Sequence, residues 1–103
     1  MNIAIIGLGL MGGSLALSLK KQDYVSSIVG YDHNQLHQTQ AIELGLVNEI
    51  VSFESIKKAD VIFLAIPVNG VIAVLKELQD ISNATIIIDI GSTKAKIVAS
   101  VPP

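Results

Sequence analysis

The stretch from Asn2 to Gly13 reads NIAIIGLGLMGG, an aliphatic run that ends in a series of glycines. The run is short, rich in isoleucine and bounded by glycine, which is typical of a strand buried inside a parallel sheet. Gly7, Gly9 and Gly12 have the spacing GxGxxG, the pattern of a turn that joins such a strand to a helix and holds a dinucleotide. The stretch therefore predicts a strand, a tight turn and a helix at the start of the chain.

Each glycine of this turn has a separate task if the turn meets a dinucleotide. Gly7 makes the tight turn, Gly9 lets the backbone approach the pyrophosphate, and Gly12 lets the helix pack close to the strand. The phosphates would lie on the free N–H groups at the start of the helix, where the helix dipole favours negative charge. The predicted cofactor contacts in this turn are Gly7, Leu8, Gly9, Leu10, Met11 and Gly12.

A membrane helix is an alternative interpretation of the same segment. Residues 3–19 carry no charge, and Gly9 and Gly13 have the GxxxG spacing of packed membrane helices. However, no basic residue precedes the run, whereas a secretory signal begins with positive charge. The run is also marginally short for a membrane span, and its glycines weaken a helix. We therefore expect no membrane segment here.

The composition limits the classes of function that the chain can have. Its 103 residues allow one domain, 50% of them are hydrophobic, and this apolar excess indicates a missing partner surface. The net charge of −2 gives no electrostatic footprint for nucleic acid. Because the chain has no cysteine, we predict a cytoplasmic protein with no disulfide framework, and we predict no metal site.

The rest of the chain alternates between segments typical of strands and segments typical of helices. A single α/β domain over residues 1–103 is therefore predicted, with the parallel, doubly wound sheet of a Rossmann-type fold. The expected strands after the first are residues 28–31, 47–51, 61–65 and 85–88. The expected helical segments after the first are residues 34–44, 52–58, 69–78 and a last helix that begins near Lys94.

Asp32 follows the second predicted strand, 20 residues beyond Gly12. An acidic residue at about this distance accepts hydrogen bonds from the adenosine ribose hydroxyls. Its carboxylate would repel the 2′-phosphate of NADP, and no arginine follows to offset that charge, so NAD is the predicted cofactor. The alternative is that Asp32 only caps the next helix. His33 and His37 are predicted to be surface residues without a role in chemistry.

The turn from Ala65 to Val68 follows the second clear buried strand. It would lie at the carboxyl edge of the sheet beside the glycine turn, where sheets of this kind bind ligands. Ala65 and Pro67 are therefore predicted to contact the cofactor. A purely structural role for Pro67 is equally compatible with the sequence, because proline fixes the backbone where the chain leaves the sheet.

Four segments together resemble the N-terminal NAD-binding domain of the prephenate dehydrogenase family: IIGLGLMGGSLA, VGYD ending at Asp32, ADVIFLAIPV from Ala59, and DIGSTK from Asp89. The resemblance implies an NAD(P)-dependent homodimeric oxidoreductase of tyrosine biosynthesis, and Asp32 favours NAD. That enzyme oxidatively decarboxylates prephenate to 4-hydroxyphenylpyruvate, or arogenate to tyrosine. Ser92 matches the family's serine that hydrogen-bonds the catalytic histidine and the substrate hydroxyl. An N-cap of the last helix is an alternative role for Ser92, and both roles can hold at once.

The family's catalytic histidine and its substrate-binding arginine have no counterpart in this sequence. We therefore expect a truncated cofactor domain that lacks the end of the nucleotide domain and the C-terminal helical dimerisation domain, and that is inactive alone. An alternative function is that of a 3-hydroxyacid dehydrogenase of the 6-phosphogluconate dehydrogenase-like group. Two features argue against it, the pair Asp32-His33 and the turn at residues 91–94. A non-catalytic NAD-sensing regulatory domain is the rival from another class.

Overall fold

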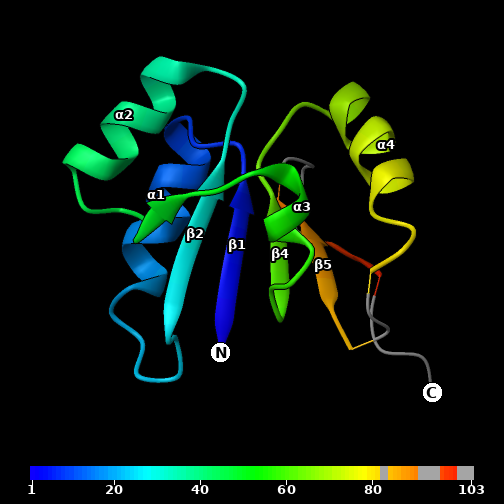
Figure 1. Ribbon diagram of the computed structural model, residues 1–103, viewed down its shortest axis with the longest axis horizontal. Coiled ribbons are helices and arrows are strands. Elements are labelled where there is room, and N and C mark those ends of the chain that lie inside the picture. The colour runs from blue at the N-terminus through cyan, green and yellow to red at the C-terminus, as the bar shows by residue number, and fades with distance from the viewer. Residues whose placement is uncertain (82–83, 91–95, 100–103) are drawn as a thin grey trace.

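A sheet of six strands forms the centre of the computed structural model, which describes residues 1–81, 84–90 and 96–99 of the chain (Figure 1). The strands are β1 (Asn2–Ile6), β2 (Ser27–Tyr31), β3 (Glu49–Ile50), β4 (Val61–Leu64), β5 (Ile86–Asp89) and β6 (Lys96–Ala99). The helices of the described residues are α1 (Leu10–Leu19), α2 (Gln35–Glu43), α3 (Phe53–Ile56) and α4 (Val68–Glu77). Across the sheet the strands follow the order β3-β2-β1-β4-β5-β6.

β1 lies at the point where the strand order reverses. It pairs in parallel with β2 on one side and with β4 on the other, so that Ile3 is level with both Ile28 and Val61. The chain runs outward from β1 to β3, crosses to the other side of β1 at β4, and continues outward to β5. This arrangement confirms the predicted Rossmann-type α/β fold, and it places the reversal directly beside the glycine turn.

Alternate residues of β1 pack against opposite layers of helices. Ile3 and Ile5 belong to a buried cluster shared with α1 and α2. Ala4 and Ile6 belong to a second cluster, shared with α3 and α4, on the other face of the sheet. A strand that is buried on both faces needs an apolar residue at every position, which explains the continuous aliphatic run in the sequence.

The uncharged segment of residues 3–19 is divided between two elements. Its first part forms β1, the glycine turn follows, and the rest forms α1, so the alternative of a single membrane helix is wrong. The helices α1 and α4 have 10 residues each, whereas a membrane span needs about 20. Within the described part of the chain no helix is long and apolar enough to cross a bilayer.

The end of the chain differs from the expectation of a helix beginning near Lys94. Lys96–Ala99 form β6, which pairs antiparallel with β5, with Ile97 opposite Ile88. A parallel strand would need a crossover of a dozen or more residues, and only residues 90–95 separate the two strands. The β-branched pair Ile97-Val98 favours a strand, and the free edge of β5 offers it a partner. The prediction of an entirely parallel sheet is therefore wrong at β6 alone.

Candidate functional site

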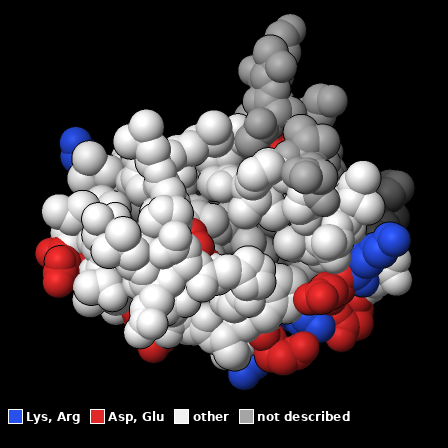
Figure 2. Space-filling view, turned by 90° about the horizontal axis from the view of Figure 1, so that it is seen from above, with Lys and Arg blue, Asp and Glu red and all other residues white. Residues whose placement is uncertain are grey.

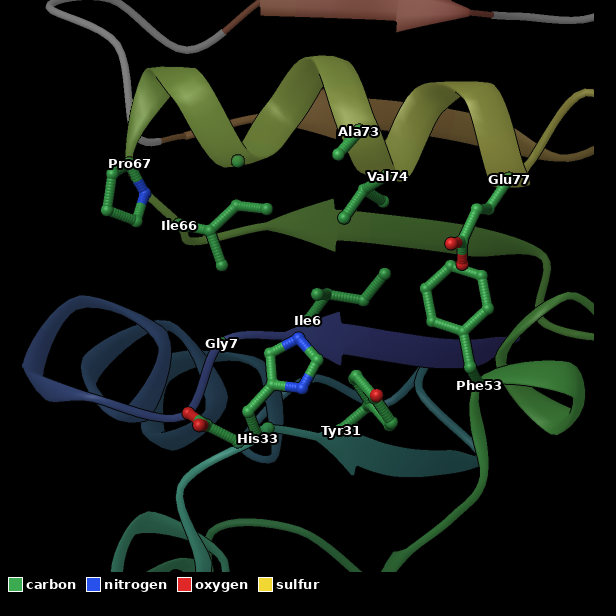
Figure 3. A pocket seen from close by; sticks show the side chains of 12 residues that line it. Ile6, Gly7, Tyr31, His33, Phe53, Ile66, Pro67, Ala73, Val74 and Glu77 are labelled. Atoms are coloured by element: carbon green, nitrogen blue, oxygen red, sulfur yellow. The ribbon is translucent and has the colours of Figure 1, made fainter.

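A pocket of about 320 Å³ lies at the carboxyl ends of β1, β2 and β4. One wall comes from the ends of β1 and β2, including Tyr31 and Asp32, and the other from Ile66, Pro67 and one face of α4 (Figure 3). Seen from this end of the sheet, the molecule is mostly uncharged around a central hollow, with most of the charged side chains toward its rim (Figure 2). The pocket thus occupies the position where doubly wound sheets bind ligands.

The glycine turn at the edge of this pocket can be built only with glycine at two of its positions. Gly7 has a φ of +98°, and a Cβ atom on it would lie 2.3 Å from the carbonyl oxygen of Ala65. A Cβ atom on Gly12 would lie 1.9 Å from the carbonyl oxygen of Gly7. These contacts confirm the predicted tasks of Gly7 in the tight turn and of Gly12 in the close packing of α1.

Gly9 differs from these two glycines, because the fold does not require it. A Cβ atom on Gly9 would meet only Cε1 of His37, at an ordinary contact distance of 3.7 Å. Gly9 is the N-cap of α1, has no side chain to cap the helix, and is followed by a first turn without an acidic residue. Leu10 is 91% exposed and Met11 is 50% exposed, so both side chains leave the first turn open. The start of α1 therefore offers backbone N–H groups and a dipole to an anion.

Leu8 is one of the predicted cofactor contacts, and in the structure its backbone amide contacts Asp32. Its N–H group donates a hydrogen bond of 2.6 Å to Oδ2 of Asp32, and its side chain is buried in the cluster beneath α1 and α2. The amide of Leu8 is therefore already engaged by the protein. Its role in this structure is to join the glycine turn to the end of β2.

Asp32 lies at the end of β2, with a side chain that is only 12% exposed. Oδ2 accepts hydrogen bonds from the N–H of Leu8 and from Nδ1 of His37, and Oδ1 accepts one of 2.7 Å from the N–H of Asn34. The N-cap of α2 is Asn34, whose side chain accepts from the N–H groups of Leu36 and His37. The alternative role of Asp32 as the helix cap is therefore wrong, and its carboxylate lines the pocket.

The surroundings of Asp32 favour its charged form. Burial raises the pKa of the carboxyl group, but the backbone hydrogen bonds from Leu8 and Asn34 and the hydrogen bond and charge of His37 outweigh that effect. The pKa of Asp32 therefore lies below its ordinary value of 3.8. A carboxylate that stays ionised is an acceptor only, which suits it to receive hydrogen bonds from hydroxyl groups.

Two residues near Asp32, His37 and Gln38, were missed by the sequence analysis. His37 was predicted to be a surface residue, but it is half-buried and places Nδ1 3.0 Å from Oδ2 of Asp32, whereas His33 is exposed as predicted. Gln38 donates from Nε2 to the backbone carbonyl oxygen of Asp32. Since Asn34 is the N-cap, His37 occupies the third position of α2, from which side chains often reach back past the helix start. Once the N-cap is known, this spacing is the signal that could have identified His37.

Ala65 and Pro67 lie beside the glycine turn, as predicted, and have different surroundings. Ala65 supports the turn, because its carbonyl group lies against Gly7 and its Cβ atom lies near Gly12. Pro67 lines the pocket and is also the N-cap of α4, where its carbonyl oxygen accepts from the N–H of Gly70 at 2.8 Å. The structural role of Pro67 is therefore confirmed, and its contact with the cofactor stays a prediction.

Ser92 lies outside the described residues. The strand that precedes it, β5, ends at Asp89, level with Leu64 at the end of β4. The chain therefore leaves β5 at the same edge of the sheet as the pocket. Among residues 1–81, 84–90 and 96–99 there is no group of three His, Cys, Asp or Glu side chains that could hold a metal ion.

Comparison with known proteins identifies the family to which this chain is similar. The family model described as "Prephenate dehydrogenase, nucleotide-binding domain" matches residues 15–103. The chain is 38% identical over 101 residues to the prephenate dehydrogenase of Bacillus subtilis, a match that covers 94% of this chain and 27% of that protein. The chain thus spans about a quarter of the length of this curated relative.

Two solved structures resemble the chain over most of its length. One is prephenate dehydrogenase from A. aeolicus in complex with hydroxyphenyl propionate and NAD+, with a TM-score of 0.79 and 31% identity over 86% of this chain and 32% of that one. The other is Synechocystis arogenate dehydrogenase, with a TM-score of 0.76 and 31% identity over the same shares. The chain belongs to the family of prephenate dehydrogenase nucleotide-binding domains.

Proposed function

We propose that this chain binds NAD and is the cofactor-binding part of a longer enzyme that oxidatively decarboxylates prephenate to 4-hydroxyphenylpyruvate in tyrosine biosynthesis. The observation that carries the proposal is that an ionised carboxylate, an open glycine turn and a pocket meet where the strand order reverses. The A. aeolicus relative, whose structure contains NAD+ and hydroxyphenyl propionate, supports the same cofactor and substrate class.

The residues around the pocket fit a dinucleotide. The ribose hydroxyls of the adenosine would donate to Asp32, and the base would lie between His33 and the α4 face that carries Val74. The pyrophosphate would lie at the open start of α1. The packing does not require glycine at position 9, but the lack of a side chain there leaves room for the phosphates. A pocket of about 320 Å³ has the size of ordinary small-molecule sites. The cofactor itself would supply the hydride acceptor.

The charges around the pocket favour NAD over NADP. The carboxylate of Asp32 would face a 2′-phosphate with like charge, and the sequence has no arginine that could bind such a phosphate. Two of the lysines are engaged elsewhere: Lys20 donates to the carbonyl oxygen of Gly45, and Lys57 pairs with Glu54 and Asp80. NAD is therefore the cofactor that we propose.

The catalytic part of the proposal rests on Ser92. Its hydroxyl group would hydrogen-bond a histidine outside this chain and the substrate hydroxyl, and so align the proton transfer that accompanies hydride transfer. The histidine, the arginine that binds the substrate carboxylate and the homodimer contacts would come from the rest of the protein. Prephenate is the substrate that we propose, with arogenate as the alternative within the same reaction. A cytoplasmic location accords with the lack of cysteine.

The deciding experiment uses the full-length protein with NAD and prephenate, and follows NADH formation and carbon dioxide release in parallel. We expect the two products in equal amounts. A parallel reaction with arogenate identifies the preferred substrate. NADH without carbon dioxide from prephenate would contradict decarboxylation, and 3-hydroxyacids would then be the next substrates to test. If NAD binds but neither product forms from either substrate, a sensing role would replace the enzyme.

A further inference from the structure

His37 lies between the two parts of the proposed cofactor site. Its Nδ1 atom is 3.0 Å from Oδ2 of Asp32, and its Cε1 atom is 3.7 Å from the place where a Cβ on Gly9 would stand. Because an ionised carboxylate can only accept hydrogen bonds, Nδ1 must carry the proton of this contact. The imidazole ring therefore donates to Asp32 whether it is neutral or protonated.

The other groups that face Asp32 leave His37 as the contact whose charge can change. Leu8 and Asn34 donate from the backbone, and Gln38 donates from its amide to the carbonyl oxygen of Asp32. Across the pocket, α4 contributes the negatively charged Glu77 to the lining (Figure 3), whereas its neighbour Lys76 does not line the pocket. On the β2 side stands His33, whose ring lies 5.4 Å from that of Tyr31, edge to face.

We propose that His37 determines the selectivity between NAD and NADP, by holding the Asp32 carboxylate in place and by cancelling its charge when the imidazole is protonated. The inference rests on the proposed function, in which Asp32 binds the adenosine ribose. With a neutral imidazole the pair carries one negative charge, which repels a 2′-phosphate. With a protonated imidazole the pair is neutral, and this repulsion disappears. Histidine is the side chain that makes this change between about pH 5 and about pH 8.

The expected consequence is a selectivity that depends on pH. NAD presents hydroxyl groups to Asp32, so its affinity changes little as His37 becomes protonated. NADP presents a phosphate, so its affinity rises as the pH falls. We expect the ratio of the NADP and NAD dissociation constants to decrease by roughly tenfold between about pH 8 and about pH 5.5, the effect of one nearby unit charge at a partly exposed site.

The test is a titration of the full-length protein with NAD and with NADP by calorimetry at both pH values. The 2′-phosphate itself gains a proton near pH 6, so the wild-type ratio alone does not isolate His37. His37→Gln keeps a polar side chain but does not titrate, and its ratio should change with pH only as far as the phosphate does. His33→Gln tests the histidine that lines the pocket itself, and the pH dependence should persist in this variant if His37 is its source.

A second variant keeps the test decisive if His37→Gln does not fold, which thermal unfolding would show. His37→Asn also does not titrate, so its ratio should again change with pH only as far as the phosphate does, whereas Asp32→Ala should weaken NAD far more than NADP. An identical pH dependence in wild type and in the two His37 variants would overturn the inference, and so would its loss in His33→Gln alone. If the wild-type protein bound neither cofactor, the proposed function would fail as well, which distinguishes the two failures.

Discussion

Asp32 is held by three parts of the chain before any ligand arrives: the glycine turn through Leu8, the loop after β2 through Asn34, and α2 through His37. Each of these contacts donates to the carboxylate, and together they fix its orientation. A ligand therefore meets an acceptor that is already oriented, and it does not have to order this side chain on binding.

The lowered pKa of Asp32 predicts a part of the acid sensitivity of the fold. A carboxyl group whose pKa is lower in the folded than in the unfolded protein stabilises the fold at any pH above its unfolded-state pKa. This stabilisation is lost as the pH falls through the folded-state pKa. For Asp32 the loss begins near its ordinary pKa of 3.8 and is complete below the folded-state pKa. Urea unfolding at several pH values between about 6 and about 2 would measure this loss in the free energy of unfolding.

Asp32→Asn is the variant for this measurement. It should be less stable than wild type at neutral pH by on the order of 1 kcal/mol, because hydrogen bonds to a charged acceptor become bonds to a neutral one. The difference should shrink as the pH falls from about 3.8 through the folded-state pKa of Asp32. Two curves that stay parallel over the whole range would show that the carboxylate is not linked to folding.

The sequence predicted the position of Asp32 but not its contact with His37, and the reason is physical. The distance from the glycine turn to the end of the second strand is nearly constant in this fold, so counting from Gly12 locates the carboxylate. The position of His37 depends on where α2 begins, and Asn34 rather than Asp32 caps that helix. With Asp32 as the cap, the helix would start two residues earlier, and every side chain of α2 would be rotated by about half a turn.

At the scale of elements, the strands with the clearest apolar runs were predicted best. β1 occupies the aliphatic run that precedes Gly7, and β4 ends one residue before its predicted end, because burial on both faces leaves a continuous aliphatic run. β6 was missed, because the alternation of strands and helices led us to expect a helix there, and the strand preference of Ile97 and Val98 takes effect only with the free edge of β5 as a partner.

Helix α1 provides a test of the packing assigned to its glycines. Gly12→Ala would place a Cβ atom 1.9 Å from the carbonyl oxygen of Gly7, so the turn must distort, and we expect a loss of about 3 kcal/mol or more in the free energy of unfolding. Its matched control is Gly13→Ala, whose Cβ atom would lie 3.2 Å from the flexible end of Leu46. The control should remain within about 1 kcal/mol of wild type, since alanine favours the helix. Denaturant unfolding of both variants compares them, and equal losses would contradict the assigned packing.

Helix α4 provides a test of the pocket. Ala73 is exposed and lines the pocket, so Ala73→Trp should fill it and weaken NAD binding by about tenfold or more. Ile72 is also exposed, but it does not line the pocket, so Ile72→Trp is the matched control and should bind NAD as wild type does. Calorimetric titration of both variants gives the comparison. Equal binding by the two variants would place the adenosine elsewhere.

At the scale of the whole molecule, the proposed reaction requires residues beyond those that bind the cofactor. If Ser92 aligns the proton transfer, Ser92→Ala in the full-length protein should lower kcat by about tenfold or more and leave the dissociation constant of NAD nearly unchanged. Steady-state kinetics with prephenate and a separate NAD titration measure the two effects. Unchanged turnover would remove Ser92 from the mechanism, and a parallel loss of NAD affinity would make it a cofactor-binding residue.

The pocket is assembled from the ends of β1, β2 and β4 and from α4, which come together only in the folded chain. A dinucleotide that binds there has no comparable site on the unfolded chain, so its binding free energy adds to that of folding. At a cofactor concentration of about 100 times the dissociation constant, the gain is about 2.7 kcal/mol. Cofactor supply in the cell would thus govern not only how fast the enzyme works but also how much of it escapes proteolysis.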